Sequence, residues 1–385
     1  MLALALTAAP SSSDKLPKTL RWEAEATLGV EYDSNATRLD SDNAQGDPVH
    51  APLMRGQGHL TLRYQPRPDV VLAGSYDLAG KAFFTEAARG QDTLIHRLTG
   101  AMGLRLGDGL AARISGLYHE GFQRAPAEGA TAGAGLFDFR LVDGRVLLAL
   151  APTDAVVGTL AVGARRFTYK PDHSLSFDAV LGALSVDVRH TLGKGKNESE
   201  LDLALSYTLS SRRFNDEFEQ LCVSHIPGCE PTDAPEPGKI VTFPYPQSTR
   251  RDLVHRLSLE ITWVRGILLS GGYEYGNSHS NSFGFGYQRH EVRAKVVAPL
   301  FWKIYGTLQL RARLMFYEAA TVVLDDPGFE EDNRSHALLQ LERQLYKGLR
   351  LVLRYTLFVG DLTSPKVASL RHLAFIGCSF RYRSR

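Results

Sequence analysis

The sequence predicts an all-β fold, in which one antiparallel up-and-down sheet closes into a transmembrane barrel of sixteen strands, with eighteen as the alternative count. Three observations predict it. Apolar and polar residues alternate over long segments, those segments are longer than the strands of soluble sheets, and short and long connections alternate between them.

The first segment shows the alternation most clearly. From Leu20 to Tyr32 every even position is apolar and every odd position is polar or glycine, which is the period of a strand. The same pattern recurs in fifteen further segments, which are residues 56–65, 70–83, 94–106, 110–123, 137–150, 156–169, 177–190, 198–212, 253–264, 267–276, 284–298, 303–317, 336–345, 349–359 and 369–382.

The lengths of these segments favour a bilayer. Most run for about 10 to 15 residues, whereas strands in soluble sheets usually have about 5 or 6. A tilted strand that crosses an outer membrane needs about 9 to 11 residues. The segments are therefore long enough to span.

The lengths of the connections between the segments also favour a membrane barrel. The short ones are residues 66–69, 107–109, 151–154, 191–197, 265–266, 299–302 and 346–348. The alternating, mostly longer ones are residues 33–55, 84–93, 124–136, 170–176, 213–252, 277–283, 318–335 and 360–368. Short turns on one rim, long loops on the other and both termini on the short-turn side are typical of bacterial outer-membrane barrels. We therefore expect one domain over residues 20–382, with long extracellular loops at 33–55, 213–252 and 318–335.

The two faces of each strand differ in polarity. On one strand Leu201, Leu203 and Leu205 alternate with Glu200 and Asp202. Sixteen strands enclose a space too wide for side chains to fill, so the charged face should line a wet lumen and the apolar face should meet lipid. Aromatic residues near both ends of the strands, among them Tyr32, Tyr118, Tyr169 and Tyr207 at the long-loop end, predict interfacial belts.

One strand breaks the pattern. Phe139 and Leu141 are apolar at odd positions, whereas Val146 and Leu148 are apolar at even ones. A β-bulge near Asp143 and Gly144 would reverse the faces between them. The strand at 284–298 has a similar ambiguity at its outer end.

The net charge is only +2, which gives no sign of a nucleic-acid partner. Sorted by strand parity, however, basic residues outnumber acidic ones on the predicted lumen face, while loops 213–252 and 318–335 are acidic. The arginines that we expect to line the lumen are Arg63, Arg97, Arg113, Arg140, Arg165, Arg189, Arg256, Arg311, Arg313, Arg354 and Arg371. Such a lumen would concentrate anions. Alternatively, the arginines pair with carboxylates on neighbouring strands as rigid ladders.

The ends and the cysteines indicate an oxidising compartment. Residues 1–19 include an apolar, small-residue stretch that we interpret as a signal-peptide remnant followed by a periplasmic N-terminal segment. Cys222 and Cys229 lie close together in a proline-rich segment, and we expect them to form a disulfide. The sequence shows no metal-ligand spacing, no cofactor fingerprint and no His followed two residues later by Ser, so we expect no metal, no cofactor and no enzymatic activity.

Over residues 20–382 the architecture resembles Gram-negative, porin-like outer-membrane β-barrels of the sixteen-strand class. The first hairpin, Gly29 to Asn35, is similar to the start of barrels associated with secretion or polysaccharide clusters. The resemblance implies the bacterial outer membrane as location, and the lipid bilayer, lipopolysaccharide and envelope-complex proteins as partners. Two functions stay open: a pore that passes anionic solutes or a polysaccharide strand, and a non-conducting barrel that anchors an envelope complex for secretion, motility or surface display.

Overall fold

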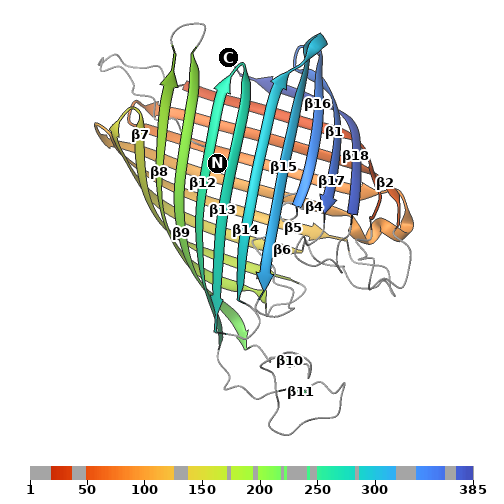
Figure 1. Cartoon of the computed structure of the whole chain (residues 1–385), viewed down its shortest axis with the longest axis horizontal. Helices are drawn as coiled ribbons and strands as arrows, with labels where there is room; N and C mark the ends of the chain where they lie inside the picture. Colours follow the sequence, from red (N-terminus) through yellow and green to blue (C-terminus); the bar gives the residue numbers. More distant parts are fainter. Residues whose placement is uncertain are drawn as a thin grey trace.

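The computed structural model describes residues 19–36, 49–124, 138–170, 175–193, 198–217, 221–222, 241–242, 249–281, 286–317, 335–359 and 370–384. Within these residues sixteen antiparallel strands form one closed barrel, which confirms the predicted fold class and strand number (Figure 1). In the same residues, no helix is both long and apolar enough to cross a membrane.

The barrel strands follow one another around the wall in chain order, and β1 pairs with both β2 and β18 to close it. Their bounds are β1 Thr19–Asp33, β2 Ala51–Arg67, β3 Val70–Phe83, β4 Thr93–Gly107, β5 Leu110–Gln123, β6 Phe139–Thr153, β7 Val156–Tyr169, β8 Phe177–Leu192, β9 Ser199–Glu217, β12 Thr249–Arg265, β13 Ile267–Ser280, β14 Tyr287–Pro299, β15 Ile304–Tyr317, β16 Ser335–Tyr346, β17 Leu349–Val359 and β18 Leu370–Arg383. Between β9 and β12 lies a separate two-stranded sheet, β10 Leu221–Cys222 with β11 Val241–Thr242.

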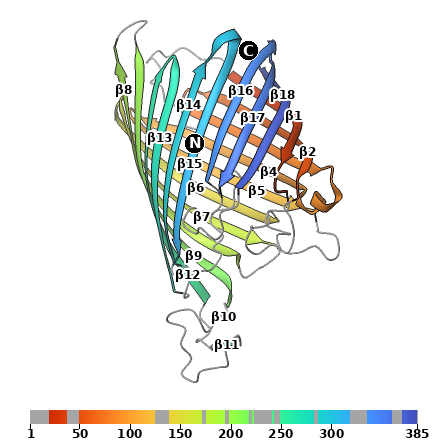
Figure 2. The same ribbon diagram turned by 45° about the vertical axis from the view of Figure 1, so that its right-hand side comes forward.

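The tilted strands place the short turns at the upper end of the barrel in Figures 1 and 2, and the long connections at the lower end. The tight connections need special backbone geometry. Gly348, between β16 and β17, has a φ of +80°, and a Cβ there would lie 2.6 Å from the carbonyl oxygen of Arg381. Any residue other than glycine would therefore be strained and would clash with β18.

The outer face carries the apolar half of the alternation. On β1, Leu28 and Val30 are exposed, and the register neighbours of Val30, Met54 on β2 and Ile376 on β18, are exposed as well. A row of exposed aliphatic side chains on every strand is stable only against lipid, because in water it would favour aggregation. The barrel is therefore built to stand in a membrane.

Aromatic residues border this apolar face, as expected. At the short-turn end Trp22 and Tyr382 pack with ring centroids 4.8 Å apart, and Trp302 and Tyr346 are largely exposed. At the long-connection end Tyr32 and Tyr207 are exposed on the outer face. Tyr169 does not belong to this belt, because its side chain is buried on the inner face.

The prediction of a β-bulge near Asp143 is wrong. The pairing of β6 with β5 and with β7 runs without a shift through Asp143 and Gly144. Phe139 and Leu141 therefore stay on the inner face with Asp143, and both are buried there. The inner face of β6 therefore changes from apolar to polar along the strand, while the backbone continues as a regular strand without a bulge.

Several predictions fall outside the described residues. They include the signal remnant in residues 1–18, Cys229 with the side chain of Cys222, and most of the three long loops. The strands reach further into these loops than expected, because β1 extends to Asp33, β9 to Glu217 and β2 begins at Ala51.

Candidate functional site: the charged inner wall

The inner wall carries ten of the eleven predicted arginines. Strand register and burial put on this face Arg63, Arg97, Arg113, Arg165, Arg189, Arg256, Arg311, Arg313, Arg354 and Arg371.

Arg140 is the exception, and the prediction that its side chain lines the lumen is wrong. It lies two residues from Val142, which is exposed on the outer face, and its Nη2 donates to Glu120 Oε1 at 3.0 Å. The assignment assumed the bulge that the strand does not have. Without it, even positions of β6 face outward along the whole strand.

One cluster of charges joins the two ends of the chain near the long-connection rim. Arg371 on β18 binds Asp33 on β1. Glu31 forms an ion pair with Arg55, with Oε1 and Nη2 2.8 Å apart, and lies 3.9 Å from Arg354. Glu31 and Asp33 are buried, so each carboxylate needs its partners to offset the loss of hydration.

A second cluster is built around Glu291 on β14, which is completely buried. Its carboxylate receives Arg311 at 2.7 Å and Arg313 at 3.0 Å from β15, and it also binds Arg293 on its own strand. Arg293 also binds Glu274 at 3.2 Å, and Glu274 binds Arg289, so four arginines share two carboxylates in this part of the wall.

Shorter ladders continue around the barrel. Asp77 binds Arg97 at 3.1 Å and His59 at 2.5 Å. Asp143 is shared in the same way between Arg145 at 2.7 Å and Arg165 at 3.0 Å. At Arg189 the arrangement is reversed, because one guanidinium lies between two carboxylates, Glu200 at 2.7 Å and Asp202 at 3.0 Å. For these arginines the ladder interpretation holds.

Toward the short-turn end the pattern changes. Arg21 on β1 faces Arg63 on β2 directly in the register, and Arg113 lies on the inner face of β5. Within the described part of the chain none of the three forms an ion pair with a carboxylate, and Arg113 Nε is buried without a hydrogen-bond partner. Like charges opposite each other destabilise a sheet, so this pair costs stability unless an anion is nearby.

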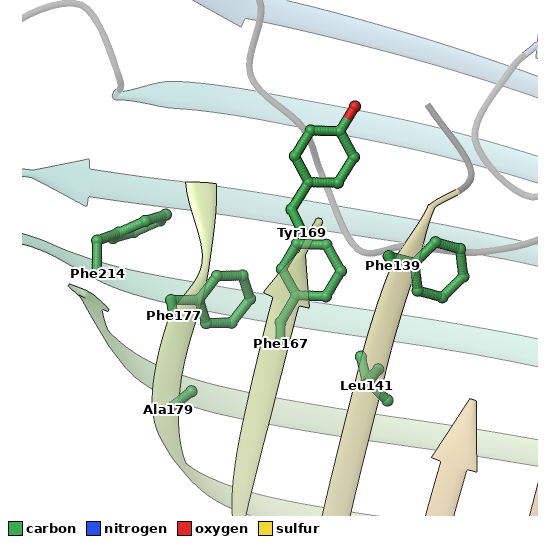
Figure 3. Close-up of a cluster of buried hydrophobic side chains, with 7 residues drawn as sticks. All are labelled: Phe139, Leu141, Phe167, Tyr169, Phe177, Ala179 and Phe214. Atoms are coloured by element: carbon green, nitrogen blue, oxygen red, sulfur yellow. The ribbon is translucent and has the colours of Figure 1, made fainter. Parts of the chain in front are cut away.

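The inner wall also holds an apolar cluster that the sequence pattern did not reveal. Side chains from the long-connection ends of β6 to β9 pack together in the lumen (Figure 3); they are Phe139, Leu141, Phe167, Tyr169, Phe177, Ala179 and Phe214. Two guanidinium groups stack on its edge, Arg212 over Phe177 at 4.9 Å and Arg250 over Phe214 at 3.9 Å. A period-two pattern with apolar inner positions could have signalled it, but the same pattern also fits a bulge.

The described residues hold no group of three or more His, Cys, Asp or Glu side chains that could bind a metal ion. What the wall offers is an array of guanidinium groups, most of them bound to carboxylates.

A closed antiparallel barrel of this size, apolar outside and charged inside, defines a β-barrel of the bacterial outer-membrane class. The sequence matches no protein-family model and no curated protein.

Solved structures with a similar fold are outer-membrane barrels. OmpF of Salmonella typhi in complex with daunomycin has a TM-score of 0.46 at 12% identity, covering 95% of this chain and 98% of that one. OmpT of Vibrio cholerae has a TM-score of 0.42 at 10% identity, with 96% and 99% covered. CdiB from Acinetobacter baumannii has a TM-score of 0.45 at 10% identity, covering 93% of this chain, which spans only 60% of CdiB. These likenesses concern the fold alone.

Proposed function

We propose that the barrel is a translocation pore of the outer membrane that favours anionic solutes. Sixteen strands enclose a space wider than side chains can fill, and the inner face carries charged residues around the wall. A charged wall is stable only when it is wet, so the interior provides a path for hydrated solutes.

The preference for anions rests on one observation above all, which is the facing pair Arg21 and Arg63 together with Arg113. These three carry positive charge into the lumen without an ion-paired carboxylate among the described residues. The Glu291 cluster adds further positive charge in the wall, because Glu274 and Glu291 together bind four arginines, Arg289, Arg293, Arg311 and Arg313.

The positive charge of the inner wall supports a proposal for the class of solute that passes. Small inorganic and organic anions fit it, and an anionic polysaccharide strand would use the same row of guanidinium groups as it passes. The partners that we propose alongside are the bilayer, lipopolysaccharide and periplasmic or envelope proteins.

A second function is favoured by the apolar cluster at the long-connection end. Phe139, Phe167 and Phe177 are almost completely buried although they face the lumen, so that part of the wall is packed and not wet. A barrel closed there would serve as an anchor for an envelope complex and would not conduct.

Solute flux distinguishes the two functions. In vesicles that contain the purified barrel, anionic solutes should enter faster than cationic solutes of the same size. A long-chain anionic polysaccharide, tested in the same way, shows whether polymers pass. If no solute enters faster than in empty vesicles, the pore proposal is wrong and the anchor function is favoured.

A further inference from the structure

The outer face carries a repeated pair of side chains that the pore does not use. In four places a tyrosine hydroxyl lies within hydrogen-bond distance of a histidine Nδ1; three of these histidines lie on the neighbouring strand, and His50 directly precedes β2. The pairs are Tyr32 with His50 at 3.1 Å, Tyr207 with His255 at 2.7 Å, Tyr273 with His290 at 2.7 Å and Tyr355 with His372 at 2.6 Å. We call these eight residues the Tyr–His collar.

The tyrosine and the histidine occupy the same relative positions in the register in each pair. Tyr207 faces Leu257 in the register, and His255 is the next outward residue along β12 toward the long connection. Tyr273 faces Val292 and Tyr355 faces Ala374, with the histidine again one outward position further on. A related contact occurs on β4, where the ring of His96 packs between those of Tyr76 and Tyr118.

The collar lies at the edge of the apolar band. On the short-turn side of Tyr207 the outward residues are Leu203 and Leu205, and on its long-connection side they become Ser211 and Arg213 beyond Leu209. Rings with one apolar face and one polar end favour the boundary between hydrocarbon and headgroups. The histidines therefore stand at the level of the headgroups in the leaflet on the long-connection side.

On β7 and β8, which carry no Tyr–His pair, charged side chains occupy the corresponding position. In the register Val142 pairs with both Tyr118 and Arg166, so Arg166 holds on β7 the place that Tyr118 holds on β5. Arg166 binds Asp178 at 2.7 Å on the outer face. Charged pairs do not lie in hydrocarbon, so this level of the wall meets a polar medium.

The hydrogen bond determines what the histidines present to that medium. A tyrosine hydroxyl that donates to Nδ1 selects the tautomer that carries hydrogen on Nε2. Within the described residues no hydrogen bond reaches the Nε2 of His50, His255, His290 or His372. A neutral ring that accepts from the tyrosine therefore carries an N–H at Nε2, and a protonated ring carries one as well.

We infer that the Tyr–His collar is a binding site for the phosphate groups of the glycolipid in the outer leaflet. A ring of N–H donors at headgroup level is complementary to phosphate oxygens, which only accept hydrogen bonds. The collar would fix the depth of the barrel and recruit phosphorylated glycolipid around it. This site is independent of the pore, because its side chains face away from the lumen.

Native mass spectrometry of the full chain, folded in detergent, tests the site directly. The probes are bisphosphorylated lipid A and the same glycolipid without its phosphates. The wild-type barrel should retain the phosphorylated form about tenfold better, the factor expected for one hydrogen bond to a charged group. Equal retention of the two forms would overturn the inference, and so would displacement of bound lipid A by an equal concentration of inorganic phosphate.

Variants locate the site. The set H50F/H255F/H290F/H372F keeps the rings but removes the donors, and it should lose the preference for phosphate. The matching histidine-to-glutamine set should keep it, since the amide nitrogen replaces the Nε2 donor. H190F alters an outward histidine near the short-turn end of β8 and should change nothing. If the phenylalanine set does not fold, the set Y32F/Y207F/Y273F/Y355F replaces it. It removes the hydroxyl groups that hold the histidine rings, and it should weaken the preference for the phosphorylated glycolipid. An unchanged preference in either set contradicts the collar.

Discussion

Arg371 and Asp33 close the barrel with a buried ion pair. Arg371 Nε donates to Asp33 Oδ1 at 2.8 Å, and the two side chains are only 2% and 0% exposed. One residue stands on the last strand and the other on the first, so this contact joins the ends of the chain. The strand pair that completes the barrel is thereby held by charge as well as by backbone hydrogen bonds.

R371A should destabilise the barrel strongly, because it leaves the Asp33 carboxylate buried without its partner. We expect the free energy of unfolding in urea to fall by about 3–5 kcal/mol. R166A is the matched control, because it breaks an exposed pair on the outer face and should leave the free energy of unfolding almost unchanged. Similar losses in the two variants would contradict the structural role of the Arg371 pair.

E291Q should destabilise the wall and increase its preference for anions. The variant leaves Arg293, Arg311 and Arg313 around an uncharged amide, and we expect a loss of about 3–5 kcal/mol in urea unfolding. E200Q removes a half-exposed carboxylate from Arg189 and should cost about 1 kcal/mol or less. An E291Q barrel as stable as E200Q would show that the Glu291 cluster is not formed.

Charge reversal at the unpaired arginines should change ion selectivity. R63E/R113E places two acids on the inner wall near the short-turn end, and the reversal potential in a salt gradient should shift toward cations. K347E makes the same kind of change in the exposed turn between β16 and β17 and should leave the potential almost unchanged. A shift as large in K347E as in the inner variant would mean that Arg63 and Arg113 do not line the path.

Reversal of Arg311 and Arg313 is a poorer test of selectivity. Both side chains are nearly buried and bind Glu291, so R311E/R313E would bring three carboxylates together and would report on folding.

The aromatic residues of the inner cluster should depend on one another. Phe167 and Phe177 have ring centroids 5.3 Å apart, and a double-mutant cycle to alanine should give a coupling of about 0.5–1.5 kcal/mol. Phe139 and Phe214 come from the two ends of the cluster, and their cycle should be additive within about 0.5 kcal/mol. Equal coupling in both cycles would mean that the variants disturb the barrel as a whole.

The strand pattern predicted the barrel because lipid imposes one simple rule on every strand, which is that the outward side chains are apolar. Leu28 and Val30 on β1 and Leu203 and Leu205 on β9 obey it along most of their length, so strand number and direction follow from the sequence. The rule fails where the wall no longer meets hydrocarbon. Phe139 and Leu141 then point inward and Arg140 outward, and the sequence alone cannot distinguish this reversal from a bulge.

The pairing of the charges could not be predicted for a different reason. Arg371 meets Asp33, and Glu291 meets Arg311 and Arg313, only after the stagger between neighbouring strands is fixed. That stagger depends on turn geometry and on closure of the whole barrel, so it is not encoded in any one strand. Which arginines stay unpaired, such as Arg63, follows from the same stagger.

The conductance of the purified barrel in a planar bilayer tests the central claim most directly. We predict stepwise current whose reversal potential in a salt gradient shows a preference for anions. Deletion of residues 218–248 removes none of the sixteen barrel strands and provides a second form of the barrel for the same measurement. No current from either the full chain or the deletion variant, despite correct insertion, would contradict the account.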